Sequence, residues 1–373
     1  GSSYDQAAVT GTITLDAALS LTLGYTPTIG DAYTIIANNG SNAVGNTFLN
    51  IAEGGTIDAV YGVQVGTFTV SYLGGAGHDV VLTCNSVNGL PVDDYMQWHY
   101  SKKVYINTKE GGANIKSNQS NFPLLVRLTS ANFNFSQAQS LGQDVRFSKS
   151  TGVHFPYQIE RWDNVSDLAE IWVNVDVIKG YNDSQYVWMY WGKSNAVDSS
   201  KSTAVFDTAN SFVAAYHFPV SSDTFGDATY NVNTGTNSGS TPNASSIIGY
   251  GRSFVRASSQ KITAADANVL DLTGTITLSA WINPTSIDTA DIIGKDSTAY
   301  DLEIIPTKYL RFGSNKTFYL SSAASAISTG SWYHVAATYN STGNPILFYV
   351  NGAQLGNSVT GAAPVETATT LYI

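Results

Sequence analysis

The chain has 373 residues, a length that favours two or three separately packed domains over a single one. Only 12% of the residues are charged, and the many Tyr, Thr, Ser, Asn and Gly residues are typical of β-structure rather than of long helices. The formal charge of −10 excludes a nucleic-acid partner, which needs a basic surface, and the absence of any stretch of roughly 20 apolar residues excludes membrane insertion.

Residues 1–84 carry short runs in which apolar and small polar residues largely alternate. The clearest are Thr10-Gly-Thr-Ile-Thr-Leu, Tyr33-Thr-Ile-Ile and Gly66-Thr-Phe-Thr-Val-Ser-Tyr. This period of two predicts strands, and glycine pairs such as Gly74-Gly75 predict the turns between them. Turn-forming residues then cluster at 85–94, where we expect a linker.

Two runs of this first segment resemble the end of autotransporter-type β-solenoid passengers. They are Gly45-Asn-Thr-Phe-Leu-Asn-Ile-Ala-Glu-Gly-Gly and Phe68-Thr-Val-Ser-Tyr-Leu-Gly-Gly-Ala-Gly-His-Asp-Val-Val-Leu-Thr. The resemblance implies a terminal piece of a longer right-handed β-helix whose preceding coils lie outside the chain. Because a solenoid coil cannot bury its own faces, such a piece needs neighbouring coils or a cap.

Residues 95–208 contain a second series of strand-like runs, each bounded by Asn, Ser or Gly. The most distinctive are Pro156-Tyr-Gln-Ile-Glu-Arg-Trp, Ala169-Glu-Ile-Trp-Val, Trp188-Met-Tyr-Trp-Gly-Lys and Ala204-Val-Phe. In this order the runs resemble the domain of unknown function 2341, which occurs in secreted bacterial and archaeal proteins. The resemblance implies a β-sandwich and brings no established chemistry with it.

Residues 209–373 form a third segment. Its characteristic runs are Phe212-Val-Ala-Ala-Tyr-His-Phe, Thr277-Leu-Ser-Ala-Trp-Ile-Asn-Pro, Ile292-Ile-Gly-Lys, Gly330-Ser-Trp-Tyr-His-Val-Ala-Ala-Thr-Tyr and Leu347-Phe-Tyr-Val-Asn-Gly. The last two alternate inward and outward before an Asn351-Gly352 hairpin turn. Together the runs resemble a laminin-G-like, concanavalin-type jelly roll, the sandwich of lectins and glucanases. We therefore expect an all-β chain: a short β-solenoid-like segment followed by two β-sandwich domains, the second a concanavalin-type jelly roll.

The end of the third segment departs from this family pattern. Jelly rolls of the family continue to a closing strand, whereas the sequence stops at Leu371-Tyr-Ile. We expect residues 212–218 to form the first strand of the domain, beside which the closing strand pairs in the family. We therefore predict that the closing strand is missing and that the first strand has an unpaired edge.

The sequence contains no array of catalytic carboxylates. A glycan hydrolase on this fold carries a Glu-x-Asp-x-x-Glu array on one strand face, spaced for the acid and the nucleophile. The nearest match is Asp301-Leu-Glu303, whose alternation places both acids on one face of a strand without a third acid. We interpret the two acids as part of a solvated strand face and expect no catalytic residues and no enzyme activity.

Calcium is the cofactor that the loop acids favour, because the ends of jelly rolls commonly offer carboxylate and carbonyl oxygens to this ion. The candidate ligands are Asp223 and Asp227, in the loop that follows the expected first strand. The competing interpretation is that these acids stabilise turns through hydrogen bonds from their side chains to the backbone.

Seven Trp and 22 Tyr residues suit sugar stacking, since an aromatic face covers the C–H face of a pyranose while polar neighbours bind its hydroxyls. In the run 186–192, alternation puts Tyr186, Trp188 and Tyr190 on one face, and one of the two faces must be core. The candidate ligand-binding residues are Trp98, Trp162, Trp188 and Tyr190.

Three β modules in series without a catalytic constellation indicate a secreted or cell-surface protein that mediates adhesion or binds carbohydrate, by analogy with the fold. Its partners are then glycans or other copies of the same protein. One alternative is a structural subunit of an extracellular fibre or sheath. Another is the non-catalytic portion of a larger secreted polysaccharide-degrading enzyme.

Overall fold

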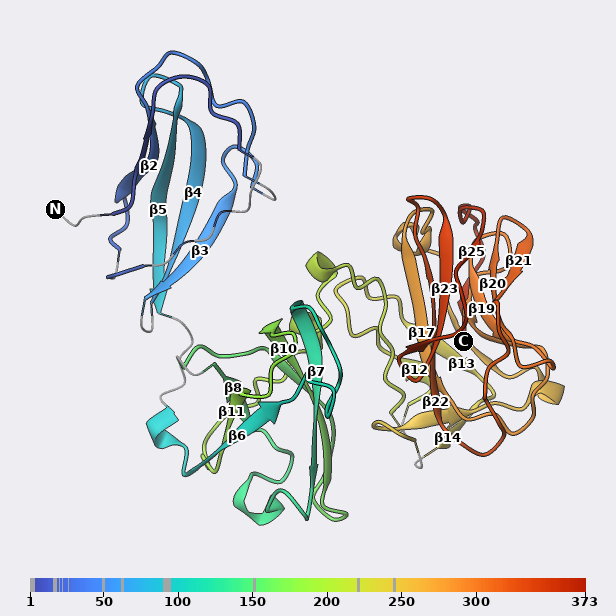
Figure 1. Ribbon diagram of the computed structural model, residues 1–373. Helices are drawn as coiled ribbons and strands as arrows, with labels where there is room; N and C mark the ends of the chain where they lie inside the picture. The colour runs from blue at the N-terminus through green and yellow to red at the C-terminus, as the bar shows by residue number, and fades with distance from the viewer. Residues whose placement is uncertain are drawn as a thin grey trace. The chain divides into compact units, whose positions relative to one another are not determined.

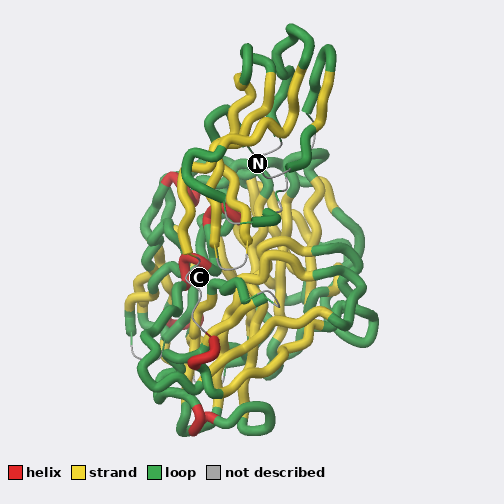
Figure 2. Tube along the Cα trace, turned by 90° about the vertical axis from the view of Figure 1, so that its left-hand side faces the viewer, coloured by secondary structure: helices red, strands yellow, loops and turns green. Residues whose placement is uncertain are grey.

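A computed structural model gives the structure of the chain. It describes residues 4–15, 19, 21, 23–25, 27–48, 51–61, 64–89, 95–149, 152–219, 222–243 and 246–373. These residues are almost entirely strand and loop, as Figure 2 shows. Their helices are three-residue 3₁₀ turns: η1 (Tyr95–Gln97), η2 (Phe135–Gln137), η3 (Ser202–Ala204), η4 (Thr208–Asn210), η5 (Arg256–Ser258) and η6 (Asn268–Leu270). In the described part of the chain, no helix has the length and apolar character that crossing a membrane requires.

The N-terminal segment forms a five-stranded sheet in the order β1-β2-β5-β4-β3 (Figure 1). Its strands are β1 (Ala7–Val9), β2 (Ala32–Asn38), β3 (Thr56–Tyr61), β4 (Gln64–Gly74) and β5 (Asp79–Gly89). Alternate residues of β4 and β5 face one core, which contains Phe68, Val70, Val80 and Leu82. The alternating runs of this segment therefore do form strands, as the pattern predicts.

The expectation of a β-solenoid is wrong for the described residues of this segment. A solenoid stacks parallel strands; here β1 and β2 run parallel and Ile13 forms a parallel bridge with Val44, whereas the other strand pairs of the described residues are antiparallel. The reason lies in the turn after β4, where Gly75 and Gly77 have positive φ and the Gly77 N–H donates to the Gly74 carbonyl. This tight turn returns the chain as an antiparallel neighbour.

The linker expected at 85–94 is shorter than predicted, because β5 continues to Gly89. Residues 90–94 lie outside the described residues.

Residues 95–208 provide two three-stranded antiparallel sheets. The first has the order β6-β11-β8, with β6 (Tyr100–Ile106), β11 (Gln185–Trp191) and β8 (Arg146–Ser148). The second has the order β7-β10-β9, with β7 (Gln119–Thr129), β10 (Leu168–Ile178) and β9 (Tyr157–Asp163). Three of the runs that resemble domain 2341 therefore lie in strands β9, β10 and β11, whereas Ala204-Val-Phe follows the 3₁₀ turn η3 and forms no strand.

The C-terminal segment is a jelly roll with one long sheet in the order β12-β13-β16-β26-β18-β19-β20-β21. Its strands are β12 (Thr224–Phe225), β13 (Gly235–Ser238), β16 (Lys261–Ala264), β26 (Leu371–Tyr372), β18 (Ala290–Gly294), β19 (Asp301–Ile304), β20 (Leu310–Ser314) and β21 (Thr317–Leu320). The other sheet contains β17 (Ile276–Ile282), β22 (Tyr333–Tyr339), β23 (Pro345–Val350), β24 (Ala353–Gln354) and β25 (Val359–Thr360). A separate hairpin pairs β14 (Thr241–Asn243) with β15 (Gly251–Ser253).

The two sheets of the jelly roll share one core. The long sheet contributes Leu302 and Phe312, and the other sheet contributes Val335 and Phe348, all nearly inaccessible to solvent. Side chains of alternate positions meet between the sheets, as in other β-sandwiches. The expected concanavalin-type jelly roll is therefore confirmed.

Residues 212–218 do not form the expected first strand. They make one isolated bridge, between Tyr216 and Asp227. The reason is that side chains satisfy their backbone: Asp227 accepts the Ala215 N–H at 3.1 Å, and the side-chain amides of Asn231 and Asn233 donate to the Val213 carbonyl at 2.9 and 3.1 Å. The expected unpaired edge is therefore absent from this segment, whereas the missing closing strand stays a prediction.

Contacts within the chain divide it into two compact units. The first comprises Gly1–Asn118, Asp144–Phe155 and Lys179–Ala196, and the second comprises Gln119–Gln143, Pro156–Ile178 and Val197–Ile373. The sheet β6-β11-β8 belongs to the first unit, and the sheet β7-β10-β9 belongs to the second with the jelly roll. The domain limits 95–208 and 209–373 stay predictions.

Candidate functional site

The pairing of β6 with β11 brings four aromatic side chains to one face of their sheet. Tyr186 lies directly opposite Tyr105, and the same face continues along β11 through Trp188 and Tyr190. We call these four residues the aromatic row. Neighbouring ring centroids of the row lie 5.7 to 6.0 Å apart, so the rings touch in sequence.

The aromatic row lies on the face of β11 that is turned away from the core. Val187 and Met189, on the other face, are almost fully buried. Of the row, Tyr105 is 62% exposed, and its three partners on β11 are partly buried. The alternation in the sequence predicts these two faces, and the structure determines which of them is core.

Lys103 extends over the aromatic row. Its Nζ lies 4.2 Å from the ring centroid of Tyr186 and 5.2 Å from that of Trp188. Both distances are within the range of a cation–π contact. The row therefore combines apolar ring surface with an ammonium group that donates hydrogen bonds.

The aromatic row is covered at its Tyr190 end. The ring of Tyr95 stacks on that of Tyr190, with centroids 4.0 Å apart and planes 13° apart. The accessible stacking surface is therefore formed by Tyr105, Tyr186 and Trp188.

Of the other predicted ligand-binding residues, Trp98 is not an open platform. Its side chain is 6% exposed and its Nε1–H donates to the carbonyl of Asp144 at 2.6 Å. The Nζ of Lys193 lies 4.3 Å from its ring centroid. Burial and this hydrogen bond make Trp98 a packing residue, so its assignment to a sugar platform is wrong.

Trp162 does not belong to the row, because it lies on β9 in the second unit. Its ring packs edge-on against Phe133 and Phe135, and it is only partly exposed. A Cβ added at Gly142 would lie 2.4 Å from this ring, so the glycine is needed for its close packing. These contacts cover much of the ring that the prediction assigned to a ligand.

The sequence analysis missed Tyr105 and Lys103. Both belong to the strand-like run Trp98-His-Tyr-Ser-Lys-Lys-Val-Tyr-Ile-Asn, and their separation of two residues already put them on a common face. The missing information was the register, because only the pairing of Tyr105 with Tyr186 and of Lys103 with Trp188 places them in the row.

The acids proposed as calcium ligands have other partners. Both oxygens of Asp227 are engaged by five donors from Ala215, Thr229 and Asn233. Asp223 is exposed and accepts from the side chains of Asn237 and Arg252 at 2.7 and 3.5 Å. Asp227 therefore fits the turn-stabilising role better than that of a calcium ligand, and calcium at Asp223 and Asp227 stays an untested prediction.

A cluster of three acidic side chains lies on the long sheet of the jelly roll. The carboxylates of Asp291, Asp301 and Glu303 have oxygens within 4.8 Å of one another. Asp301 and Glu303 are 2% and 4% exposed, so their interpretation as a solvated strand face is wrong. Hydrogen bonds compensate for their burial: Asp301 accepts the Gly313 N–H at 2.8 Å, and Glu303 accepts a hydrogen bond from Arg311.

Two family models match the chain. Residues 256–373 match the concanavalin A-like lectin/glucanases superfamily, and residues 141–217 match a domain of unknown function, DUF2341. Two of the three resemblances that the sequence suggested are thereby confirmed, and neither match covers the segment that resembles autotransporter passengers. No curated protein was found to match the chain.

Solved structures show a low overall similarity. Domain 4 of AbnA, a GH43 extracellular arabinanase from Geobacillus stearothermophilus in complex with arabinotriose, is 19% identical over 39% of this chain and 75% of its own, with a TM-score of 0.32. A putative carbohydrate binding protein from Bacteroides ovatus is 15% identical over 69% of each chain, with a TM-score of 0.28.

Proposed function

We propose that this protein is an extracellular, non-enzymatic module that binds neutral glycans on the aromatic row. The observation that carries the proposal is the row itself: Tyr105, Tyr186 and Trp188 present ring surface on the face of the sheet turned away from the core. Aromatic rings of this kind cover the C–H faces of sugar rings, because those faces are apolar while the hydroxyls point outward.

The fold of the third segment supports carbohydrate as the class of ligand. Residues 256–373 have the concanavalin-like fold of lectins and glucanases, which is consistent with a carbohydrate-binding module. The proposed location outside the cell rests on the resemblance of residues 95–208 to a domain of secreted proteins. Adhesion to a glycan-bearing surface is the role that these two points favour.

The proposed binding mode uses two kinds of contact. Pyranose rings stack along Tyr105, Tyr186 and Trp188, and the ammonium of Lys103 shifts from the ring faces to donate hydrogen bonds to hydroxyls. Contacts spread over three neighbouring rings suit an extended chain of sugars better than a single one. The centroids of these rings lie 5.7 and 5.8 Å apart and their planes are inclined by 60° and 85°, so each ring contacts the sugar chain with its own face or edge.

Replacement of Trp188 by Ala is expected to weaken glycan binding by about tenfold to a hundredfold. A central aromatic anchor contributes about 2 kcal/mol or more to binding, and each 1.4 kcal/mol corresponds to about a factor of ten. Retardation of the full chain in native gels that contain soluble laminarin, xylan or agarose measures the change. Tyr105→Ala is expected to have a smaller effect in the same direction.

The matched control for this experiment is Trp281→Ala. Trp281 lies on β17 of the jelly roll and is 42% exposed, so the substitution removes the same side chain outside the aromatic row. Unchanged retardation of this variant is expected. If Trp281→Ala abolishes binding while Trp188→Ala does not, the aromatic row is not the binding surface.

We further propose that the chain does not hydrolyse glycans. The carboxyl groups of Asp301 and Glu303 are buried and already bonded to Gly313 and Arg311, which leaves them unsuited to reach a glycosidic bond. Incubation with laminarin, xylan and agarose should release no reducing ends. Turnover that disappears in Asp301→Asn or Glu303→Gln would contradict this proposal.

A further inference from the structure

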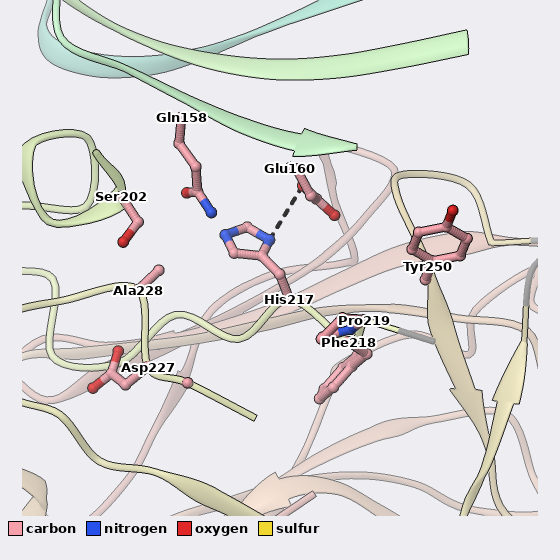
Figure 3. A pocket seen from close by; sticks show the side chains of 10 residues that line it. Gln158, Glu160, Ser202, His217, Phe218, Pro219, Asp227, Ala228 and Tyr250 are labelled. Carbon is pink, nitrogen blue, oxygen red and sulfur yellow. Dashed lines mark ion pairs between the residues drawn. The ribbon is translucent and has the colours of Figure 1, made fainter. Parts of the chain in front are cut away.

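The second unit contains a small cavity that the aromatic row does not explain. It has a volume of about 270 Å³ and lies between β9, the start of η3 at Ser202, and residues 217–219 and 226–228 (Figure 3). Its polar lining includes Gln158, Glu160 and His217, which Figure 3 shows around one space. All residues that line it belong to the second unit.

One wall of the cavity is a buried ion pair. His217 Nδ1 lies 3.1 Å from an Oε2 of Glu160 whose side chain is 6% exposed. The indole N–H of Trp172 donates to the same oxygen. Burial alone raises the pKa of Glu160, but the hydrogen bonds from His217 and Trp172 outweigh it, so its pKa is lowered and the group is a carboxylate.

Two polar atoms in this cavity have no partner among the described residues. They are His217 Nε2 and Gln158 Oε1, and both are inaccessible to solvent. Because His217 Nδ1 faces Glu160, Nε2 is the ring nitrogen left to form a hydrogen bond with an occupant of the cavity. A buried polar group without a partner is unfavourable, so two such atoms around one cavity indicate a place for a ligand that forms hydrogen bonds.

The rest of the lining restricts the chemistry of the occupant. Among the described residues that line the cavity there is no Lys or Arg, whereas Glu160 and Asp227 are acidic, so an anion is disfavoured. Ser202 and Tyr250 add hydroxyl groups, and Phe218 and Pro219 add apolar surface at the side where Tyr250 lies (Figure 3). Acceptors, hydroxyls and an apolar wall together match a neutral, polyhydroxylated ring.

We propose that this cavity binds a single neutral pyranose unit, as a second carbohydrate site independent of the aromatic row. Hydroxyls of the sugar form hydrogen bonds with His217 Nε2 and donate to Gln158 Oε1, and the C–H face of the ring packs against Phe218 and Pro219. The volume of about 270 Å³ lies just below the roughly 300 to 1,000 Å³ of typical small-molecule sites, so it admits one ring and not a chain.

Gly226 allows a direct test of this site. It lines the cavity, and a Cβ added there meets no atom within 4 Å, so Gly226→Leu introduces a side chain into open space at the cavity wall. Gly274→Leu is the matched control, because Gly274 is exposed, does not line the cavity and also has open space around an added Cβ. Neither glycine has a positive φ, so neither substitution strains the backbone.

The experiment is saturation-transfer NMR on the full chain with the methyl glycosides of glucose, galactose and mannose. Transfer to at least one of them is expected in the parent chain and in Gly274→Leu, and none in Gly226→Leu. Gln158→Met keeps the shape of the side chain and removes the acceptor, and it should weaken binding about tenfold, as expected for one lost hydrogen bond in a closed site.

Two outcomes overturn the proposal. The first is transfer that is absent in the parent chain or unaffected by Gly226→Leu. The second is saturation transfer to methylammonium and none to the glycosides, which would identify a site for a small cation. The variant Trp188→Ala separates this site from the aromatic row, since it should lose retardation by polysaccharides and keep the transfer to the methyl glycoside.

Discussion

Replacement of Lys295 by Met is expected to destabilise the jelly roll by about 3 to 5 kcal/mol, a large part of the roughly 5 to 15 kcal/mol that stabilises a typical domain. The side chain of Lys295 is inaccessible to solvent, and its Nζ donates to Asp266 and Asp271 at 2.6 Å each and to the Thr367 carbonyl at 2.9 Å. It therefore joins three segments of the domain.

The expected loss of stability comes from the aspartates that lose their cation when Lys295 is replaced. Burial alone lowers the pKa of Lys295, but its hydrogen bonds to the two aspartates outweigh burial and raise it, so the amine is charged at neutral pH. Without it, Asp271, whose side chain is 11% exposed, keeps a charge with no cation beside it. A buried charge that loses its partner is strongly unfavourable.

Urea unfolding of the full chain, followed by hydrogen exchange in peptides from β18 to β20, measures this loss. The control is Lys261→Met, which removes an exposed lysine from β16 and should change the unfolding free energy little. Adding Asp271→Asn to Lys295→Met should recover part of the stability. A loss of under about 1 kcal/mol in the single variant, the size typical of exposed ion pairs, would show that this ion pair contributes no more than a surface one.

The unfolding free energy of the jelly roll is expected to fall as the pH rises from about 4 to about 7 because of Asp301. Burial raises the pKa of this carboxyl to about 7, with the charges of Glu303 and Asp291 acting in the same direction against the Gly313 N–H and Arg311. In the unfolded chain its pKa is about 3.9. The folded protein thus holds an extra proton in this window, which stabilises it at the acidic end.

At about 1.4 kcal/mol per pKa unit, Asp301 accounts for at most about 4 kcal/mol of this change. The variant Asp301→Asn is neutral at every pH, and its amide oxygen still accepts the Gly313 N–H. It should match the parent chain near pH 4 and exceed it in stability at pH 8. The pKa of Asp291 is also raised, to about 6, first by desolvation of its carboxyl and then by the hydrogen bond and charge of Glu303, but the residue as a whole is exposed, so Asp291→Asn is a control with a smaller effect.

The measurement is the difference in unfolding free energy between Asp301→Asn and the parent chain at pH 4 to 8. Titrations shared by the two proteins cancel in this difference, so Asp301 dominates what is left. A difference that stays constant across the range would rule out a shifted pKa of this carboxyl in the folded state.

Much of the jelly roll could be predicted from the sequence because its signals are local. The alternation in 277–284, 332–339 and 347–350 reappears as β17, β22 and β23. The Asn351-Gly352 turn has the two positive φ values that a two-residue hairpin requires. Such features depend on neighbours within a few residues, and the sequence contains those neighbours in full.

The candidate sites depended on contacts between distant residues. Alternation separated Trp188 and Tyr190 from Val187 and Met189, but the pairing with β6 was needed to add Tyr105 and Lys103. The cavity at His217 unites residues from β9 with residues some 40 to 90 positions later, and no local pattern predicts such a meeting.

The sequence by itself determined that the chain is β-structured, where most strands run and which side chains share a strand face. Only the tertiary structure decided that Trp98 is buried, that Asp301 and Glu303 are covered, and that residues 212–218 bond to the side chains around Asp227 and do not form a strand. The physical reason is that a strand's periodicity follows from its own backbone, whereas burial and backbone hydrogen bonding depend on which distant residues pack against a group in the folded chain. Side chains that compete with a neighbouring strand for the same N–H and C=O groups leave no periodic trace in the sequence.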